Sequence, residues 1–260
     1  MSLASGDLVL LFFAFFIVAM LYSAVGFGGG SSYLAILTLV LTSFFAIRTT
    51  ALLCNLVVVT GSCILFYRSG HLHLKKFVPF IITSIPMAFL GASFKLDEQF
   101  FFILLALALI ISAIALIYQT LKLNSNNEFK EYPTYIPYLL GGTVGLLSGL
   151  VGIGGGIFLA PVLNYIKWDK PIVIAALASF FIFVNSISGI GGLFASNSFE
   201  VLWPETIGLL LAVLLGGQLG VRLSISKLSA KRIRMLTAFL VLFVGLRVLF
   251  KNGFQLSMMS

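Results

Sequence analysis

Two glycine runs interrupt the most apolar parts of this chain, and their backbone could bind an anion. They read GFGGG at 26–30 and GIGGG at 152–156. A short apolar segment follows each run, so a helix is expected to begin at Ser31 and at Ile157. The first N–H groups of a helix have no partner within it, and together with the positive end of the helix dipole they attract anions. The pattern predicts an anion site made of backbone donors, without a buried lysine or arginine.

Two asparagines in later apolar segments are the side-chain candidates for the same site. Asn55 and Asn185 each stand six residues before a glycine, in NLVVVTG and NSISGIG. On a helix, Arg48, Ala51 and Ser62 share the face of Asn55. The other interpretation is an interhelical hydrogen bond, worth about 0.6 kcal/mol on average in a membrane. The predicted substrate-binding residues are Gly28, Gly29, Gly30, Ser31, Asn55, Gly154, Gly155, Gly156, Ile157 and Asn185.

The glycines also have a purely structural interpretation, since small residues let membrane helices pack closely. That interpretation is favoured for GGQLG at 216–220, which has the GxxxG spacing. A functional break is favoured for the two runs, because their glycines are tripled, repeated, and each followed by a short segment. A dinucleotide fingerprint is excluded, because GIGGGIF lacks the third spaced glycine.

Composition defines the kind of protein that carries these residues. Of the 260 residues, 60% are hydrophobic and 9% are charged, whereas soluble domains carry roughly 25% charged residues. Several apolar runs reach the roughly 20 residues that a helix needs to span a bilayer. The net charge of +8 comes from short loops, where membrane orientation explains it without a nucleic-acid partner. The sequence therefore predicts an all-α polytopic membrane protein with lipid as its surroundings.

The chain divides into two similar halves, which predicts an internal repeat. A first repeat at 1–121 and a second at 134–260 flank the polar linker 122–133, KLNSNNEFKEYP. The expected helical segments are 7–25, 31–47, 49–67, 77–94 and 100–121, then 135–151, 157–166, 171–195, 205–221 and 235–250.

Basic residues predict how these segments cross the membrane. If each glycine-broken stretch enters and returns on the same side, twelve of the sixteen Lys and Arg share the cytoplasmic side. Their loops are 68–76, 122–131, 167–170 and 222–234; Arg48, Lys95, Arg247 and Lys251 remain outside. The halves then have opposite topology, each with a re-entrant hairpin and three transmembrane helices, and both termini lie outside. Segment 157–166 covers about 15 Å, half of a ~30 Å core, whereas 31–47 is long enough to reach further.

The residues that are missing limit the function. The apolar segments contain no nucleophile–base pair and no cluster of metal ligands, so neither an enzyme nor a cofactor or metal site is expected. Inverted repeats are typical of secondary transporters. A monovalent anion that leaves a cell at −100 mV gains about 2.3 kcal/mol, which is enough to drive export without coupling. A small-anion channel with the same donors and a structural subunit remain the alternatives. The phenylalanine-rich surface suits a homodimer contact and lipid equally.

With these residues the chain resembles the sulfite exporter TauE/SafE family of membrane permeases. The resemblance rests on the two glycine blocks, on GGQLGVRLS and on the terminal FLVLFVGLRVLF, and it covers nearly the whole chain. The block SGLVGIGGGIFLAPVL, which includes Pro161, is the most specific; in the first block Ala35 stands where the family tends to have proline. The resemblance implies outward transport of sulfite, sulfonates or other small sulfur-containing anions across the plasma membrane.

Overall fold

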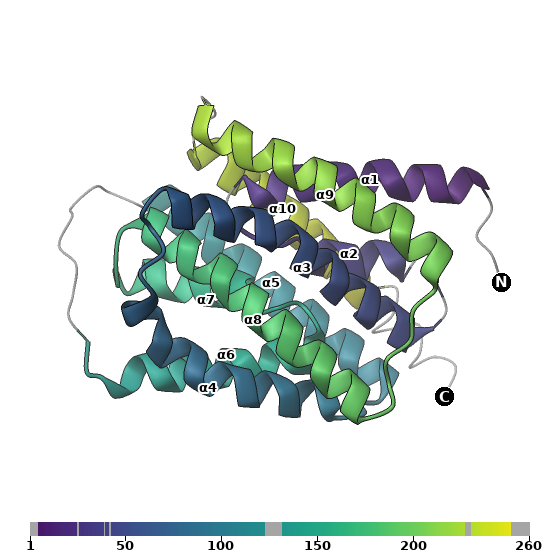
Figure 1. The fold of residues 1–260 in the computed structure, drawn as a ribbon, viewed down its shortest axis with the longest axis horizontal. Coiled ribbons are helices and arrows are strands. Elements are labelled where there is room, and N and C mark those ends of the chain that lie inside the picture. Colours follow the sequence, from purple (N-terminus) through teal and green to yellow (C-terminus); the bar gives the residue numbers. More distant parts are fainter. Residues whose placement is uncertain are drawn as a thin grey trace.

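Every regular element among the described residues is a helix. The computed structural model describes residues 5–24, 26–38, 40–41, 43–122, 132–226 and 230–250. In these ranges the helices are α1 Ser5–Ser23, α2 Gly30–Leu37, α3 Phe44–Arg68, α4 Leu74–Ser93, α5 Glu98–Lys122, α6 Tyr135–Val151, α7 Gly156–Tyr165, α8 Pro171–Ala195, α9 Trp203–Ser226 and α10 Ala230–Val248. Most of them run along the long axis of the molecule (Figure 1).

Length and composition agree with the predicted membrane protein. Five of the described helices, within α3, α4, α5, α8 and α9, are long and apolar enough to cross a membrane. Helices α2 and α7 are much shorter, with 8 and 10 residues. At 1.5 Å per residue they extend about 12 and 15 Å.

One predicted segment is wrong. The run 31–47 was expected to be a single stretch, but α2 ends at Leu37 and α3 begins at Phe44. Ser43 caps α3, because its hydroxyl accepts a hydrogen bond from the N–H of Ala46 at 3.3 Å. The first short helix is therefore about as short as the second. In the predicted linker 122–133, residues 123–131 lie outside the described residues.

The packing of the first five helices recurs in the last five. Helix α1 packs on α9, and its counterpart α6 packs on α4. Helix α3 also contacts α9, and its counterpart α8 contacts α4. The short helix α2 packs on α3 and α10, and its counterpart α7 packs on α8 and α5. The equivalent pairs α3 with α8 and α5 with α10 pack on each other. The helices of each set of five therefore pack mainly against helices of the other set.

Contacts along α4, α6 and α8 show that these helices run in one direction. On α6, Gly141 faces the Phe80 carbonyl of α4, and Gly145 faces Ser84 one turn further. A Cβ at Gly145 would lie 2.6 Å from Cα of Ser84, so only glycine allows this approach. On α8, the Ser188 hydroxyl donates to the Ile85 carbonyl, and Gly192 lies against Phe89.

Helices α1, α3 and α9 also share a direction. Gly216 and Gly220 of α9 lie against the backbone carbonyls of Phe16 and Met20 in α1. The close packing expected of GGQLG is therefore confirmed. Between α3 and α9, Oγ1 of Thr50 lies 3.4 Å from Oγ1 of Thr206, and Gly61 lies against the side chain of Gln218. The residue numbers therefore increase in the same direction along both helices.

The two groups of helices are antiparallel to each other. Near one end, Leu52 of α3 lies against Gly189 of α8; near the other, Phe66 of α3 and Ile172 of α8 line one cavity. Because α3 and α8 run oppositely, so do the equivalent pairs α1 with α6 and α4 with α9. The connection between α1 and α3, which contains α2, therefore leads back to the end of the molecule where α1 began.

Basic loops lie at one end of the molecule. The ends of α3 and α9 and the starts of α4, α6 and α8 are at the left of Figure 1, and α1 begins at the right. At the left end, Nζ of Lys76 lies 2.7 Å from Oδ2 of Asp169, which joins the start of α4 to the 166–170 loop. At the other end, the Ser43 hydroxyl donates to Glu200.

Candidate functional site

Left-handed glycines form both helix breaks. Gly29, the N-cap of α2, has φ 87°, and Gly155, the N-cap of α7, has φ 82°. Three residues earlier, Gly26 and Gly152 also have positive φ, at 82° and 75°. L-residues rarely adopt this conformation, whereas glycine does so readily. The runs are glycine-rich because each break needs at least two left-handed residues.

The structure brings the two breaks together at Asn55. This α3 side chain is fully buried, and its Nδ2 donates a hydrogen bond to the carbonyl of Ile153 in the second break at 2.8 Å. In the first break, Gly28 and Gly30 leave so little room that an added Cβ would contact the Asn55 amide. Oδ1 of Asn55 has no hydrogen-bond partner among the described residues. One side chain thus touches glycine breaks about 125 positions apart in sequence.

Asn185 is buried at the matching level of α8. The register that places Leu52 beside Gly189 sets Asn55 level with Asn185 and Ser186 across the α3–α8 contact. Asn185 is 1% exposed, and neither atom of its amide is hydrogen-bonded to a described residue. A Cβ at Gly154 would lie 3.2 Å from Oγ of Ser186, so this level of α8 borders the second break.

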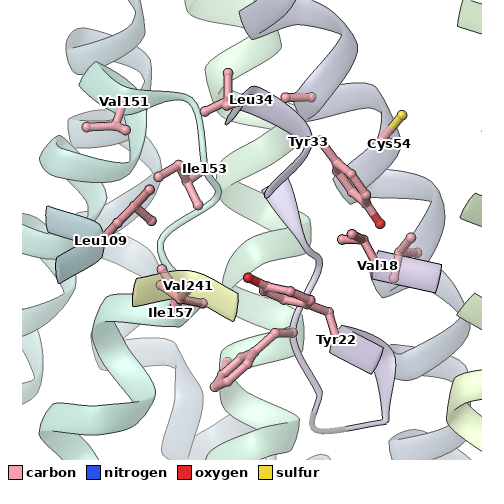
Figure 2. Packing of buried hydrophobic residues seen from close by; sticks show 14 of the residues in the cluster. Val18, Tyr22, Tyr33, Leu34, Cys54, Leu109, Val151, Ile153, Ile157 and Val241 are labelled. Carbon is pink, nitrogen blue, oxygen red and sulfur yellow. The ribbon is translucent and has the colours of Figure 1, made fainter. Parts of the chain in front are cut away.

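The N-terminus of α2 lies beside two tyrosine hydroxyls that sequence reasoning missed, whereas Ser31 was among the predicted residues. The Tyr22 hydroxyl of α1 lies 3.3 Å from Oγ of Ser31 and 2.8 Å from Oγ of Ser32. Tyr33 is fully buried, and its hydroxyl has no partner in the described part of the chain. Figure 2 shows Tyr22 and Tyr33 flanking the first break, with Ile153 on the second break beside it. Isolated tyrosines in apolar helices are too common for sequence to distinguish these two.

The first residues of α7, Gly156 and Ile157, have no polar side chains and offer backbone donors. The first intrahelical bonds of α7 are from Phe158 and Leu159 to the Gly155 carbonyl, so the N–H groups of Gly156 and Ile157 precede them. The α2 start has the same pattern, with Ser32 and Tyr33 bonded to Gly29. The two helix starts are therefore equivalent in backbone and different in side chains.

The expectation of a region without a buried cation is wrong. Arg48 was expected between the helical segments 31–47 and 49–67, but α3 begins four residues before it and its side chain is 1% exposed. Its Nη2 donates to the Gly149 carbonyl of α6 at 2.9 Å. The guanidinium carbon lies 5.4 Å from the ring centre of Phe44 and 5.6 Å from that of Phe101. Its burial was missed because the start of α3 was placed too late and because its partners belong to α5 and α6.

A cavity of about 250 Å³ opens at the end with the basic loops. Its polar lining comes from Ser23, Ser62, Ser69 and His71. Ser62 is buried, and its hydroxyl has no partner within the described ranges. It lies two turns from Asn55 on the same face of α3, so this face carries both the cavity lining and Asn55.

Chemically, these residues form a buried set of hydrogen-bond donors. The amides of Asn55 and Asn185, the hydroxyls and the first N–H groups of two helices suit an oxyanion. No group of three His, Cys, Asp or Glu that could hold a metal ion occurs within the described residues.

These features define a polytopic α-helical membrane transport protein. The model of the family "Sulfite exporter TauE/SafE" matches residues 11–248. The chain belongs to this family.

Curated relatives agree in class. The chain is 33% identical over 239 residues to the probable membrane transporter protein y4hK of Sinorhizobium fredii, covering 91% of this chain and 96% of that protein. It is 26% identical to the probable membrane transporter protein YunE of Bacillus subtilis, covering 90% and 94%. It is 28% identical to MJ0441 of Methanocaldococcus jannaschii, another probable membrane transporter protein, covering 93% and 95%. No solved structure matches the chain significantly.

Proposed function

We propose that this protein is a secondary transporter that exports small sulfur-containing anions, such as sulfite or organosulfonates, across the plasma membrane. The substrate binds where the two glycine breaks meet, at the N-termini of α2 and α7 and the amides of Asn55 and Asn185. The observation that carries this proposal is the contact of Asn55 with both breaks. The family description supports the substrate class.

In this proposal the halves 1–121 and 134–260 are inverted repeats joined by a cytoplasmic linker at 122–133. The opposite directions of α3 and α8 support the inversion. The shared direction of α1 and α3, with the short α2 between them, supports a re-entrant hairpin. Alternating access then comes from one repeat moving against the other around the buried site.

The two ends of the proposed pathway differ, which favours a transporter over the alternative anion channel. A cavity is present at the end with the basic loops. Near the other end, Arg48 packs between Phe44 and Phe101. A pathway open at one end and filled at the other fits an inward-facing state of an alternating-access protein.

The function is tested with purified protein in liposomes loaded with sulfite or with methanesulfonate. At an inside-negative potential we expect efflux with an initial rate that saturates as the internal anion concentration rises. Protein-free liposomes report the leak. Unitary currents in a planar bilayer would instead assign the channel, and retention of both anions would contradict the proposal.

The topology makes a separate prediction for two exposed positions. With Cys54 and Cys63 replaced by alanine, Ser69→Cys should react with a membrane-impermeant thiol reagent only from the cytoplasmic side. Lys95→Cys should react only from outside, because α4 separates these positions. Intact cells and inverted membrane vesicles provide the two sides. Labelling of both positions from the same side would refute the crossing pattern, and exchanged sides would refute the orientation.

A further inference from the structure

We propose that Arg48 is a second anion-binding point, on the outer side of Asn55, which recognises the negative charge of the substrate. The expected ligand is a small oxyanion or the sulfonate group of an organosulfonate. The inference rests on the proposed anion transport for its physiological role, but the binding that it predicts is measured independently of transport.

The first observation is a buried charge whose hydrogen bonding is incomplete. Arg48 is 1% exposed and uses Nη2 to bond the Gly149 carbonyl. Its Nε and Nη1 have no hydrogen-bond partner among the residues that the structure describes. An arginine keeps its charge even when buried, and its five donors match the oxygens of an anion.

No carboxylate in the described ranges forms an ion pair with Arg48. Among the described side chains, the ion pair that is formed joins Lys76 to Asp169 at the opposite end of the molecule. Glu200 lies near the start of α3, but it accepts from Ser43 and its N–H faces Thr49. The Phe44 and Phe101 rings offset part of the cost of burying the guanidinium. An isolated buried charge is otherwise unfavourable, so an anionic ligand is the natural partner.

The second observation is a line of such groups along α3. Arg48, Asn55 and Ser62 follow one another at intervals of seven residues, about 10 Å along a helix. Each is buried; Arg48 and Ser62 have donors without a partner in the described chain, whereas the unpartnered atom of Asn55 is the acceptor Oδ1. Ser62 lines the cavity at the end with the basic loops, and Asn55 touches both breaks. The line thus joins the cavity, the proposed site and Arg48 along one face.

The third observation is that the charge has no equivalent in the other half. By the correspondence of Asn55 with Asn185, the counterpart of Arg48 on α8 is Ala178. If the buried arginine served only to join helices, an equivalent cation would be expected in α8, but that position is Ala178. A single positive charge on the outer side of the site instead draws an anion toward the exit.

The test compares thermal stabilisation of the detergent-purified protein by sulfite and by methanesulfonate, with neutral dimethyl sulfone as the uncharged analogue. A ligand that binds only the folded protein raises its melting temperature. The wild type should be stabilised by the two anions and not by the sulfone. Arg48→Gln should need about 10- to 100-fold more anion for the same shift, since it loses charge-assisted hydrogen bonds. Arg48→Lys should fall between the two, because it keeps the charge and loses the fork of donors.

The matched control is Arg247→Gln. Arg247 is exposed on α10, at the end of the molecule that the proposal places outside, and its substitution should leave the anion shift unchanged. Without anion, Arg48→Gln should melt no lower than the wild type, because it removes an uncompensated buried charge. A lower melting temperature with an intact anion shift would assign Arg48 a structural role and overturn the inference.

Failure of this inference differs from failure of the proposed function. If the wild type exports sulfite and Arg48→Gln binds anions with unchanged affinity, the proposed transport function is supported and the proposed role of Arg48 is refuted. If the wild type binds anions through Arg48 but transports none of them, the export proposal is refuted and the anion-binding role of Arg48 is supported. If anions stabilise neither protein, the inference is refuted, and the efflux assay alone decides the function.

Discussion

Replacing Asn55 by alanine is expected to lower the initial rate of sulfite efflux by about 100-fold. The substitution removes an amide that contacts both glycine breaks and leaves the Ile153 carbonyl without its donor. In the proposed site this amide also donates to the anion, and a hydrogen bond to a charged group contributes about 3 kcal/mol at the upper end, which corresponds to about two orders of magnitude. The rate is measured in proteoliposomes containing equal amounts of wild-type or variant protein.

Two companion variants separate binding from folding. Asn185→Ala should lose efflux to a similar extent with an unchanged melting temperature, because its amide is unpaired in the described protein. Asn55→Ala should also lower the melting temperature, because its hydrogen bond to Ile153 is lost. Asn164→Ala is the control: that half-buried amide bonds the Ala160 carbonyl of its own helix, so efflux should persist. Normal efflux after substitution of both Asn55 and Asn185 would rule out the proposed site.

The second large effect is expected from Gly155→Ala at the start of α7. Gly155 has φ 82°, and an added Cβ would lie 2.9 Å from Cε1 of Phe181 and 3.0 Å from Cβ of Ser148. The left-handed conformation alone costs an L-residue about 1–2 kcal/mol. Relief of the crowding moves the helix start and its N–H donors, so we expect at least a tenfold slower efflux and a lower melting temperature. Efflux and thermal unfolding are measured on the same preparations.

A glycine elsewhere in the second half provides the matched control. Gly142 lies inside α6, and a Cβ there would meet its nearest neighbour, Cβ of Thr83, at an ordinary 3.7 Å. Gly142→Ala should keep wild-type efflux and match or exceed the wild-type melting temperature, because alanine stabilises a helix interior by about 0.5–1 kcal/mol. Equal behaviour of Gly155→Ala and Gly142→Ala would mean that the break has no special geometry.

Helical segments and glycine breaks could be predicted because they depend on local chemistry. A long apolar run has few ways to satisfy its backbone other than as a helix, and most of the expected segments are present. The breaks at 26–30 and 152–156 were placed correctly because glycine is disfavoured in helices and readily left-handed. The boundary between α2 and α3 was missed because Ser43, a single weak capping signal, ends an otherwise apolar run.

The composition of the site depended on contacts between distant segments. Sequence singled out Asn55 through its internal counterpart, but not its bond to Ile153, which is 98 residues away. Tyr22 and Tyr33 carried no signal, since their role arises from the return of α2 beside α1. Arg48 was misplaced because its burial depends on the Gly149 carbonyl of α6 and on Phe101 of α5.

By itself, the sequence determined that this is a helical membrane protein in which glycines break two apolar stretches. These properties follow from hydrophobicity, charge and backbone freedom, which act within a few residues of the chain. The sequence also predicted that both breaks lie beside Asn55, but only the tertiary structure decided that Asn55 donates to the Ile153 carbonyl and that Arg48 is a buried cation bonded to α6. The reason is physical: hydrogen bonding and desolvation depend on which atoms surround a group, and here those atoms come from helices about 100 residues apart.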